Sequence, residues 1–179
     1  DAQLPDHITS NGSKIGMRHS PRMILLTGAT GFLGAFLLAE LMRQTQATII
    51  CLVRPDRGLT NPEEQHQTAS DRLTNVIENY GLISCVDTSR LEVMTGDLKQ
   101  PEWGIPKNQY QELSERIDAI IHNGAYVHHG LPYENLKTTN VHGTLESIKF
   151  AFKSRVPLHF ISSLSVLPPQ LVQGFKRYY

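Results

Sequence analysis

A glycine-rich stretch at residues 27–34, Thr-Gly-Ala-Thr-Gly-Phe-Leu-Gly, constrains the fold more than any other part of this sequence. An apolar run of strand length, residues 23–26, leads into the stretch, and a longer run of helix-forming residues, 35–42, leads out of it. The glycines therefore lie on a strand-to-helix turn, the context in which such a spacing predicts dinucleotide binding. No Gly-Lys-Ser/Thr follows, so the stretch is not the phosphate loop of an ATPase.

Each glycine has a distinct expected task. Gly28 permits a tight turn because it has no Cβ, Gly31 lets a pyrophosphate approach the backbone, and Gly34 lets the helix lie close to the sheet. The helix N-terminus then offers free N–H groups and a partial positive charge to the phosphates. The alternative is a glycine turn that binds nothing. The other cofactor-binding candidates in the stretch are Thr27, Thr30, Phe32 and Leu33.

Beyond the turn, strand patterns alternate with helix patterns. Strands are expected at 47–53, 91–95, 119–122 and 158–161, and helices at 63–80, 109–116 and 134–152. This alternation predicts an α/β protein with a Rossmann-type doubly wound parallel sheet and right-handed crossovers. The inner side of the last helix is expected to carry five apolar residues: Leu136, Val141, Leu145, Ile148 and Phe152.

Composition limits the function and the location. The 17 basic residues balance the 17 acidic ones, which argues against a general nucleic-acid or membrane-surface binder. The two cysteines show no pairing pattern, and no apolar run is long enough to span a membrane or forms a signal-peptide core. We therefore expect a cytoplasmic protein. Residues 1–22 are expected to be a linker or extended arm, and residues 23–179 a Rossmann domain cut from something longer.

Candidate ligand-binding side chains follow the strands, at the edge where parallel sheets bind ligands. The second strand ends in Arg54, with no acidic residue immediately before it, and Arg57 and Arg72 add charge. An arginine at this place accommodates the 2′-phosphate of NADP, so NADPH is favoured. Two alternatives stay open, a solvated Arg54 beside a proline turn and an NAD-type role for Asp56.

The remaining strand ends carry weaker signals. Asp97 is expected to accept from the adenine amino group beside the backbone of Leu98, unless it only caps its own turn. The small residues at 123–125 (Asn123, Gly124 and Ala125) let the backbone close on the cofactor, or form a tight turn. A hydroxyl at Ser162 or Ser163 suits a carbonyl oxygen that is becoming an alkoxide, although paired serines are common in turns. His128 and His129 lack further ligands at metal spacing, so no metal is expected.

Taken together, the motifs resemble the thioester reductase domains of nonribosomal peptide and polyketide synthetases, within the extended short-chain dehydrogenase/reductases. Carboxylic acid reductases and fungal aminoadipate reductases carry a similar domain. The resemblance covers residues 23 to about 166. Its motifs are the stretches 27–34, 51–54, 72–73, 80–82, 96–98, 122–125, 132–133, 140–144 (which begins with Asn140) and 162–166.

The resemblance implies an NADPH-dependent release reaction. An acyl or peptidyl chain, held as a thioester on the phosphopantetheine arm of a carrier domain, would be reduced to an aldehyde, and in some members to the alcohol. Ser163 matches the family's Ser/Thr, which holds the carbonyl oxygen. The family's catalytic Tyr and Lys, four residues apart, are not found, since neither Tyr178 nor Tyr179 has a Lys four residues later. The domain is therefore expected to be C-terminally incomplete. His128 stands where many relatives are expected to have Asn.

Two other functions remain open at this stage. One is an extended short-chain dehydrogenase acting on a nucleotide sugar, as an epimerase or dehydratase, against which Arg54 argues. The other is a module that binds NADPH without catalysis, which suits a chain without the Tyr and Lys.

Overall fold

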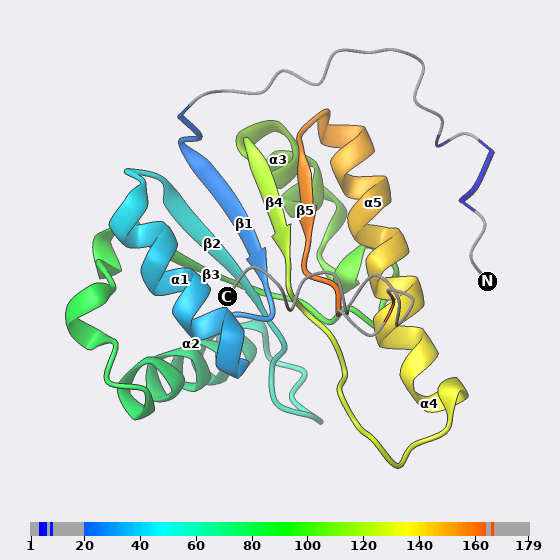
Figure 1. The fold of residues 1–179 in the computed structure, drawn as a ribbon, viewed down its shortest axis with the longest axis horizontal. Coiled ribbons are helices and arrows are strands. Elements are labelled where there is room, and N and C mark those ends of the chain that lie inside the picture. Colours follow the sequence, from blue (N-terminus) through cyan, green and yellow to red (C-terminus); the bar gives the residue numbers. More distant parts are fainter. Residues whose placement is uncertain (1–3, 7, 9–19, 164–165, 167–179) are drawn as a thin grey trace, which may run out of the picture.

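The computed structural model describes residues 4–6, 8, 20–163 and 166, so most of the predicted arm lies outside the described residues. A parallel sheet of five strands forms the centre, in the order β3-β2-β1-β4-β5 (Figure 1). The expected α/β architecture with a parallel sheet is confirmed. The strands are β1 (Met23–Thr27), β2 (Thr48–Val53), β3 (Leu91–Thr95), β4 (Ala119–His122) and β5 (Leu158–Phe160).

Helices cover both faces of the sheet (Figure 1). Helices α1 (Phe32–Gln44) and α2 (Pro62–Asn79) pack on one face, and α3 (Lys107–Arg116) and α5 (Gly143–Ser154) pack on the other. Helix α4 (Tyr133–Lys137) continues into α5 through a π-helical turn, Thr138–His142. Among the residues that the structure describes, no helix combines the length and the apolar composition needed to cross a membrane.

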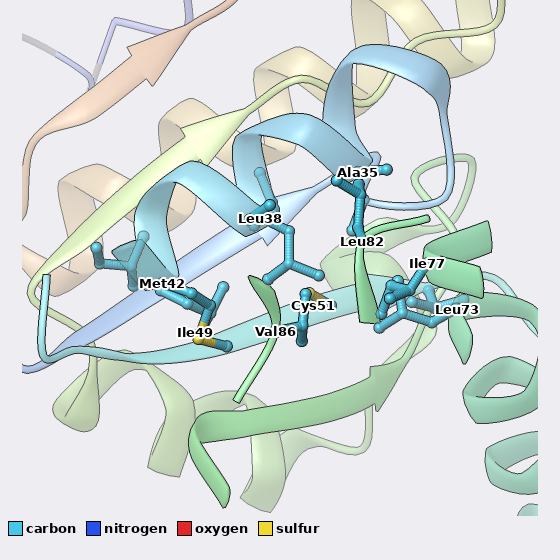
Figure 2. Packing of buried hydrophobic residues seen from close by; sticks show 14 of the residues in the cluster. Ala35, Leu38, Met42, Ile49, Cys51, Leu73, Ile77, Leu82 and Val86 are labelled. Atoms are coloured by element: carbon cyan, nitrogen blue, oxygen red, sulfur yellow. The ribbon is translucent and has the colours of Figure 1, made fainter. Parts of the chain in front are cut away.

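Two hydrophobic cores form because alternate residues of the central strands point to opposite faces. Ile49 and Cys51 of β2 pack under α1 and α2 (Figure 2), whereas Ile50 and Leu52 pack towards α3 and α5. Cys51 is fully buried, and this burial raises the pKa of its thiol to about 12. On the other face, the rings of Trp103, Tyr110 and Phe150 pack against one another.

The last helix buries a different face from the one predicted. Four of the five expected inner residues are only partly buried, and Phe152 is 50% exposed. The buried positions are Thr139, Gly143, Ser147, Phe150 and Ala151. The prediction was wrong for two physical reasons. The π-helical turn adds a residue to the local repeat, which a uniform period of 3.6 does not follow. The buried positions also include Ser147, whose hydroxyl hydrogen-bonds inside the fold, and an apolar pattern does not report such a residue.

The strand order contains one point at which the direction of winding reverses. From β1 the chain moves outward to β2 and β3, and then returns to the opposite side of β1 as β4. Open α/β sheets bind ligands at this point, outside the carboxyl ends of the strands. The last residues of β1 and β4, Thr27 and His122, lie opposite each other in the register. The loops that follow them therefore frame the candidate site.

Candidate functional site

The glycine turn has the geometry that its sequence predicts. Gly28 has a φ of 73°, and a Cβ there would lie 2.7 Å from the Cα and N atoms of Gly124. The N–H of Gly31 donates to the carbonyl of Gly28 at 3.1 Å. A Cβ on Gly34 would lie 1.9 Å from that same carbonyl oxygen, so α1 begins directly against the turn. A side chain at either Gly28 or Gly34 would push apart the backbones that meet here.

The N-terminus of α1 is left open by this turn. Gly31 is its N-cap residue and has no side chain to satisfy the first N–H groups, and the first turn contains no acidic residue. The ring of Phe32 packs instead against Phe36 and Tyr80 on the surface of the helices, with centroids 5.3 and 5.7 Å away. The N–H groups at the start of α1 therefore point at the carboxyl edge of the sheet, where an anion would find them unpaired.

The loop after β4 closes on the glycine turn. Asn123 donates from Nδ2 to the carbonyl of Gly28 at 3.2 Å, and the N–H of Gly124 donates to Thr27 Oγ1 at 3.0 Å. A Cβ on Gly124 would lie 2.6 Å from a methyl group of Leu98. The structure thus brings together the loops that follow β1, β3 and β4, and Ala125 is exposed just beyond their junction.

The loop after β3 supports both interpretations of Asp97. One carboxylate oxygen, Oδ1, accepts from the N–H of Lys99 at 3.0 Å, which is the turn-capping role. The N–H of Asp97 donates to the carbonyl of Trp103 at 2.9 Å and fixes the start of the loop. Within the described part of the chain, the second carboxylate oxygen makes no hydrogen bond, so it remains able to accept from a ligand.

The arginines at the end of β2 divide into two kinds. Arg72 donates to the carbonyl of Arg54 at 2.6 Å and forms an ion pair with Asp56. Arg72 therefore neutralises the one nearby carboxylate and holds the turn in place. Arg54 and Arg57 are exposed, and neither side chain makes an ion pair or hydrogen bond to the described residues. Two guanidinium groups that have no partner among the described residues thus lie beyond the carboxyl end of β2.

The candidates later in the chain are Asn140, Ser162 and Ser163. The side-chain amide of Asn140 is held by the backbone of Tyr126, from which Oδ1 accepts at 2.7 Å and to which Nδ2 donates at 3.0 Å. This side chain therefore shapes the loop after β4. Ser162 and Ser163 are exposed beyond β5, next to β4. The ammonium of Lys99 lies 5.6 Å from the centre of the Tyr126 ring.

His122 is the site residue that the sequence reasoning did not select. Its ring is fully buried between β1, β4 and α5, and burial lowers its pKa to about 4. Nδ1 lies 2.8 Å from Thr27 Oγ1, and Nε2 lies 3.2 Å from Thr144 Oγ1. The available signal was a histidine that ends an apolar strand, together with hydroxyl residues at the ends of β1 and along the following helix.

The fold and this junction define a dinucleotide-binding α/β domain. A family model described as "Male sterility protein" matches residues 26–179. Glycine betaine reductase ATRR of Emericella nidulans is 36% identical over 176 residues, which cover 98% of this chain and 14% of that protein.

Two solved structures are also similar. The terminal R domain from the myxalamid PKS-NRPS biosynthetic pathway has a TM-score of 0.80 at 41% identity, covering 93% of this chain and 41% of that domain. A thiolation-reductase di-domain from an archaeal nonribosomal peptide synthetase has a TM-score of 0.63 at 28% identity, covering 80% of this chain and 36% of that one.

The chain belongs to the family that the "Male sterility protein" model describes, within the extended short-chain dehydrogenase/reductases, and it matches part of the reductase domains of nonribosomal peptide and polyketide synthetases. Membership of this family implies that the chain binds a nicotinamide cofactor. The chain spans less than half of the solved reductase domains and about a seventh of the fungal reductase.

Proposed function

We propose that this chain is the NADPH-binding part of an enzyme that releases a carrier-bound acyl or peptidyl thioester by reducing it to an aldehyde. The observation that carries the proposal is the junction of the glycine turn with the loop after β4, at the point where the sheet reverses its winding. Backbone atoms meet there so closely that no Cβ fits, which is the form of a cradle for a dinucleotide.

The residues present fit NADPH part by part. The open N–H groups of α1 suit the pyrophosphate, and the free guanidinium of Arg54, assisted by Arg57, suits the 2′-phosphate. The second oxygen of Asp97 and the backbone of Leu98 suit the adenine. The small residues 123–125 line the path towards the nicotinamide. An NAD-type role for Asp56 is disfavoured because Arg72 already neutralises that carboxylate.

The chemistry follows from what each group can donate. When bound, NADPH supplies a hydride to the thioester carbonyl carbon. Ser163 donates a hydrogen bond to the carbonyl oxygen, which takes up a proton as the hemithioacetal forms. The carbon–sulfur bond then breaks, and the thiol of the phosphopantetheine arm leaves with a proton while the aldehyde is released. The carrier domain is the proposed partner, and the known thiolation-reductase di-domain supports this pairing. No nucleic-acid or membrane partner is proposed.

The test uses a protein that contains this chain, the remainder of a reductase domain and a carrier domain. Incubation of that protein with NADPH and a series of acyl thioesters on its own carrier domain should yield one aldehyde and one free carrier thiol for each NADPH consumed. Ser163→Ala should lower the rate by about 100- to 1,000-fold, since one hydrogen bond to a developing oxyanion is lost. The matched control is Ser89→Ala, in the turn that precedes β3. Absence of aldehyde with every acyl group, or turnover of a nucleotide sugar instead, would refute the proposal.

A further inference from the structure

His122 lies at the centre of a hydrogen-bonded network that joins three elements. Thr27 ends β1, His122 ends β4, and Thr144 and Ser147 lie one turn apart on α5. Thr27 Oγ1 is 2.8 Å from Nδ1, Thr144 Oγ1 is 3.2 Å from Nε2, and Ser147 Oγ is 3.2 Å from Nδ1. The ring also stacks on Phe160 of β5, with centroids 5.8 Å apart. Each of these four partners is uncharged.

The hydroxyl protons determine the direction of the network, because each hydroxyl has one proton to donate. Thr144 donates its proton to the carbonyl of Asn140 at 2.6 Å, so towards His122 its oxygen can only accept. Nε2 must therefore carry a hydrogen. A neutral ring then has a bare Nδ1, which accepts the proton of Thr27. Ser147 donates its proton to the carbonyl of Gly143 at 2.9 Å, so it makes no hydrogen bond to a bare Nδ1. Thr27, which is nearer at 2.8 Å, is the donor to Nδ1.

The chain of hydrogen bonds begins and ends in the loop after β4. At one end, the N–H of Gly124 donates to Thr27 Oγ1 at 3.0 Å. At the other end, the chain reaches the carbonyl of Asn140, whose side chain holds both the N–H and the carbonyl of Tyr126. The loop is thus held at Gly124 and at Tyr126 by a single series of bonds that passes through one buried ring.

We propose that His122 is a positioning residue for the cofactor cradle: its neutral ring links Thr27 to Thr144 and so locks the glycine turn, the loop after β4 and helix α5 into one unit. The inference rests on the proposed cofactor site for its consequence in binding. The hydrogen bonds of His122 can be tested separately, in the chain without cofactor. A ring that merely fills space would be replaced by phenylalanine without loss, because the stacking on Phe160 would remain.

The first experiment measures the proton on the ring. In the chain labelled with 15N-histidine, His122 should give the nitrogen shifts of a neutral ring protonated at Nε2 alone, with Nδ1 as an acceptor. Exchange of the Gly124 and Tyr126 amide hydrogens should be slow. A ring protonated at Nδ1, or an average of both tautomers, would overturn the assignment.

The second experiment removes the links one at a time. His122→Phe and Thr144→Val should speed amide exchange at Gly124 by about 5- to 30-fold, the effect of losing one or two hydrogen bonds, and weaken NADPH binding by a similar factor. His122→Asn, which keeps an acceptor near Nδ1, should restore part of both losses. His66→Phe and Thr68→Val, on the outer part of α2, are the matched controls.

Unchanged amide exchange at Gly124 in Thr144→Val would overturn the inference. Because Thr144→Val removes only one half-buried hydroxyl, it still provides the test if His122→Phe fails to fold. If the parent chain binds no NADPH, the proposed function is contradicted. The exchange rates still decide whether His122 locks the cradle, so the two failures are distinguishable.

Discussion

Arg54 carries the choice of cofactor in this account. Its guanidinium is exposed at the end of β2 and unpaired within the described residues, whereas Arg72 is committed to Asp56 and to the backbone of Arg54. The sequence predicted three basic groups at this edge. Their division into ligand-facing and structural arginines depends on side-chain packing, which spacing along the chain does not reveal.

Replacing Arg54 tests that division. Arg54→Asp should raise the dissociation constant of NADPH by about 10- to 100-fold, because a charge-assisted contact to phosphate becomes a repulsion. The constant for NADH should change by less than about threefold, since NADH has no 2′-phosphate. Arg43→Asp, an exposed arginine on α1 paired with Glu40, is the control and should affect neither. Equal losses for both nucleotides would remove Arg54 from this role.

Gly28 tests the contact between the two backbones. Gly28→Ala should lower the free energy of unfolding by about 2–4 kcal/mol, because the new Cβ meets the backbone of Gly124 in addition to the strain of a positive φ. Gly58→Ala has a similar positive φ but open space around its Cβ, and should cost about 1 kcal/mol. Urea denaturation of both variants measures the difference. Equal costs would mean that only backbone strain matters at Gly28.

His122 should make stability depend on pH. Burial lowers the pKa of His122 from 6.5 to about 4. Between pH 6.5 and pH 4, His122 therefore binds a proton in the unfolded chain and stays neutral in the folded chain. The free energy of unfolding should therefore fall by about 3 kcal/mol as the pH drops from 6.5 to 4, and this contribution should level off below pH 4. Denaturation curves of the parent and of His122→Asn should differ in this slope. The slope should persist in His66→Asn, and its persistence in His122→Asn would contradict the assignment.

At the scale of elements, helix α5 shows where sequence patterns fail. The strands at 91–95 and 119–122 were predicted to the residue, because short runs rich in apolar residues and bounded by turn residues mark strands. The helical segment was also predicted. The buried face of the segment was not predicted. Its inward positions carry a glycine, against which Leu98 packs, and hydroxyls that lie beside His122. Apolar periodicity reports burial by hydrophobicity and misses burial by hydrogen bonding.

Two phenylalanines on α5 test the corrected face. Phe150→Ala should lower the free energy of unfolding by about 3–5 kcal/mol, because the ring is fully buried against Trp103 and Tyr110. Phe152→Ala, two residues later and half exposed, should cost less than about 1 kcal/mol. Chemical denaturation of both variants provides the comparison. A larger loss of unfolding free energy for Phe152→Ala than for Phe150→Ala would support the buried face that the apolar pattern predicted.

At the scale of the whole molecule, the topology followed from few features. Alternating strand and helix patterns, with a glycine turn after the first strand, were enough to predict a parallel sheet with a site at its carboxyl edge. The junction at Gly28 and Gly124 could not be predicted at this level, because it depends on contacts between residues 96 positions apart. The same holds for the partners of His122, which come from β1 and α5.

The central claim is that this junction is an NADPH cradle, and one titration tests it most directly. Reduced-nicotinamide fluorescence of the chain should be measured with increasing NADPH and, separately, with increasing NADH. We predict saturable binding of both nucleotides, with NADPH at least about 10-fold tighter through its 2′-phosphate. Equal affinities, or a preference for NADH, would contradict it.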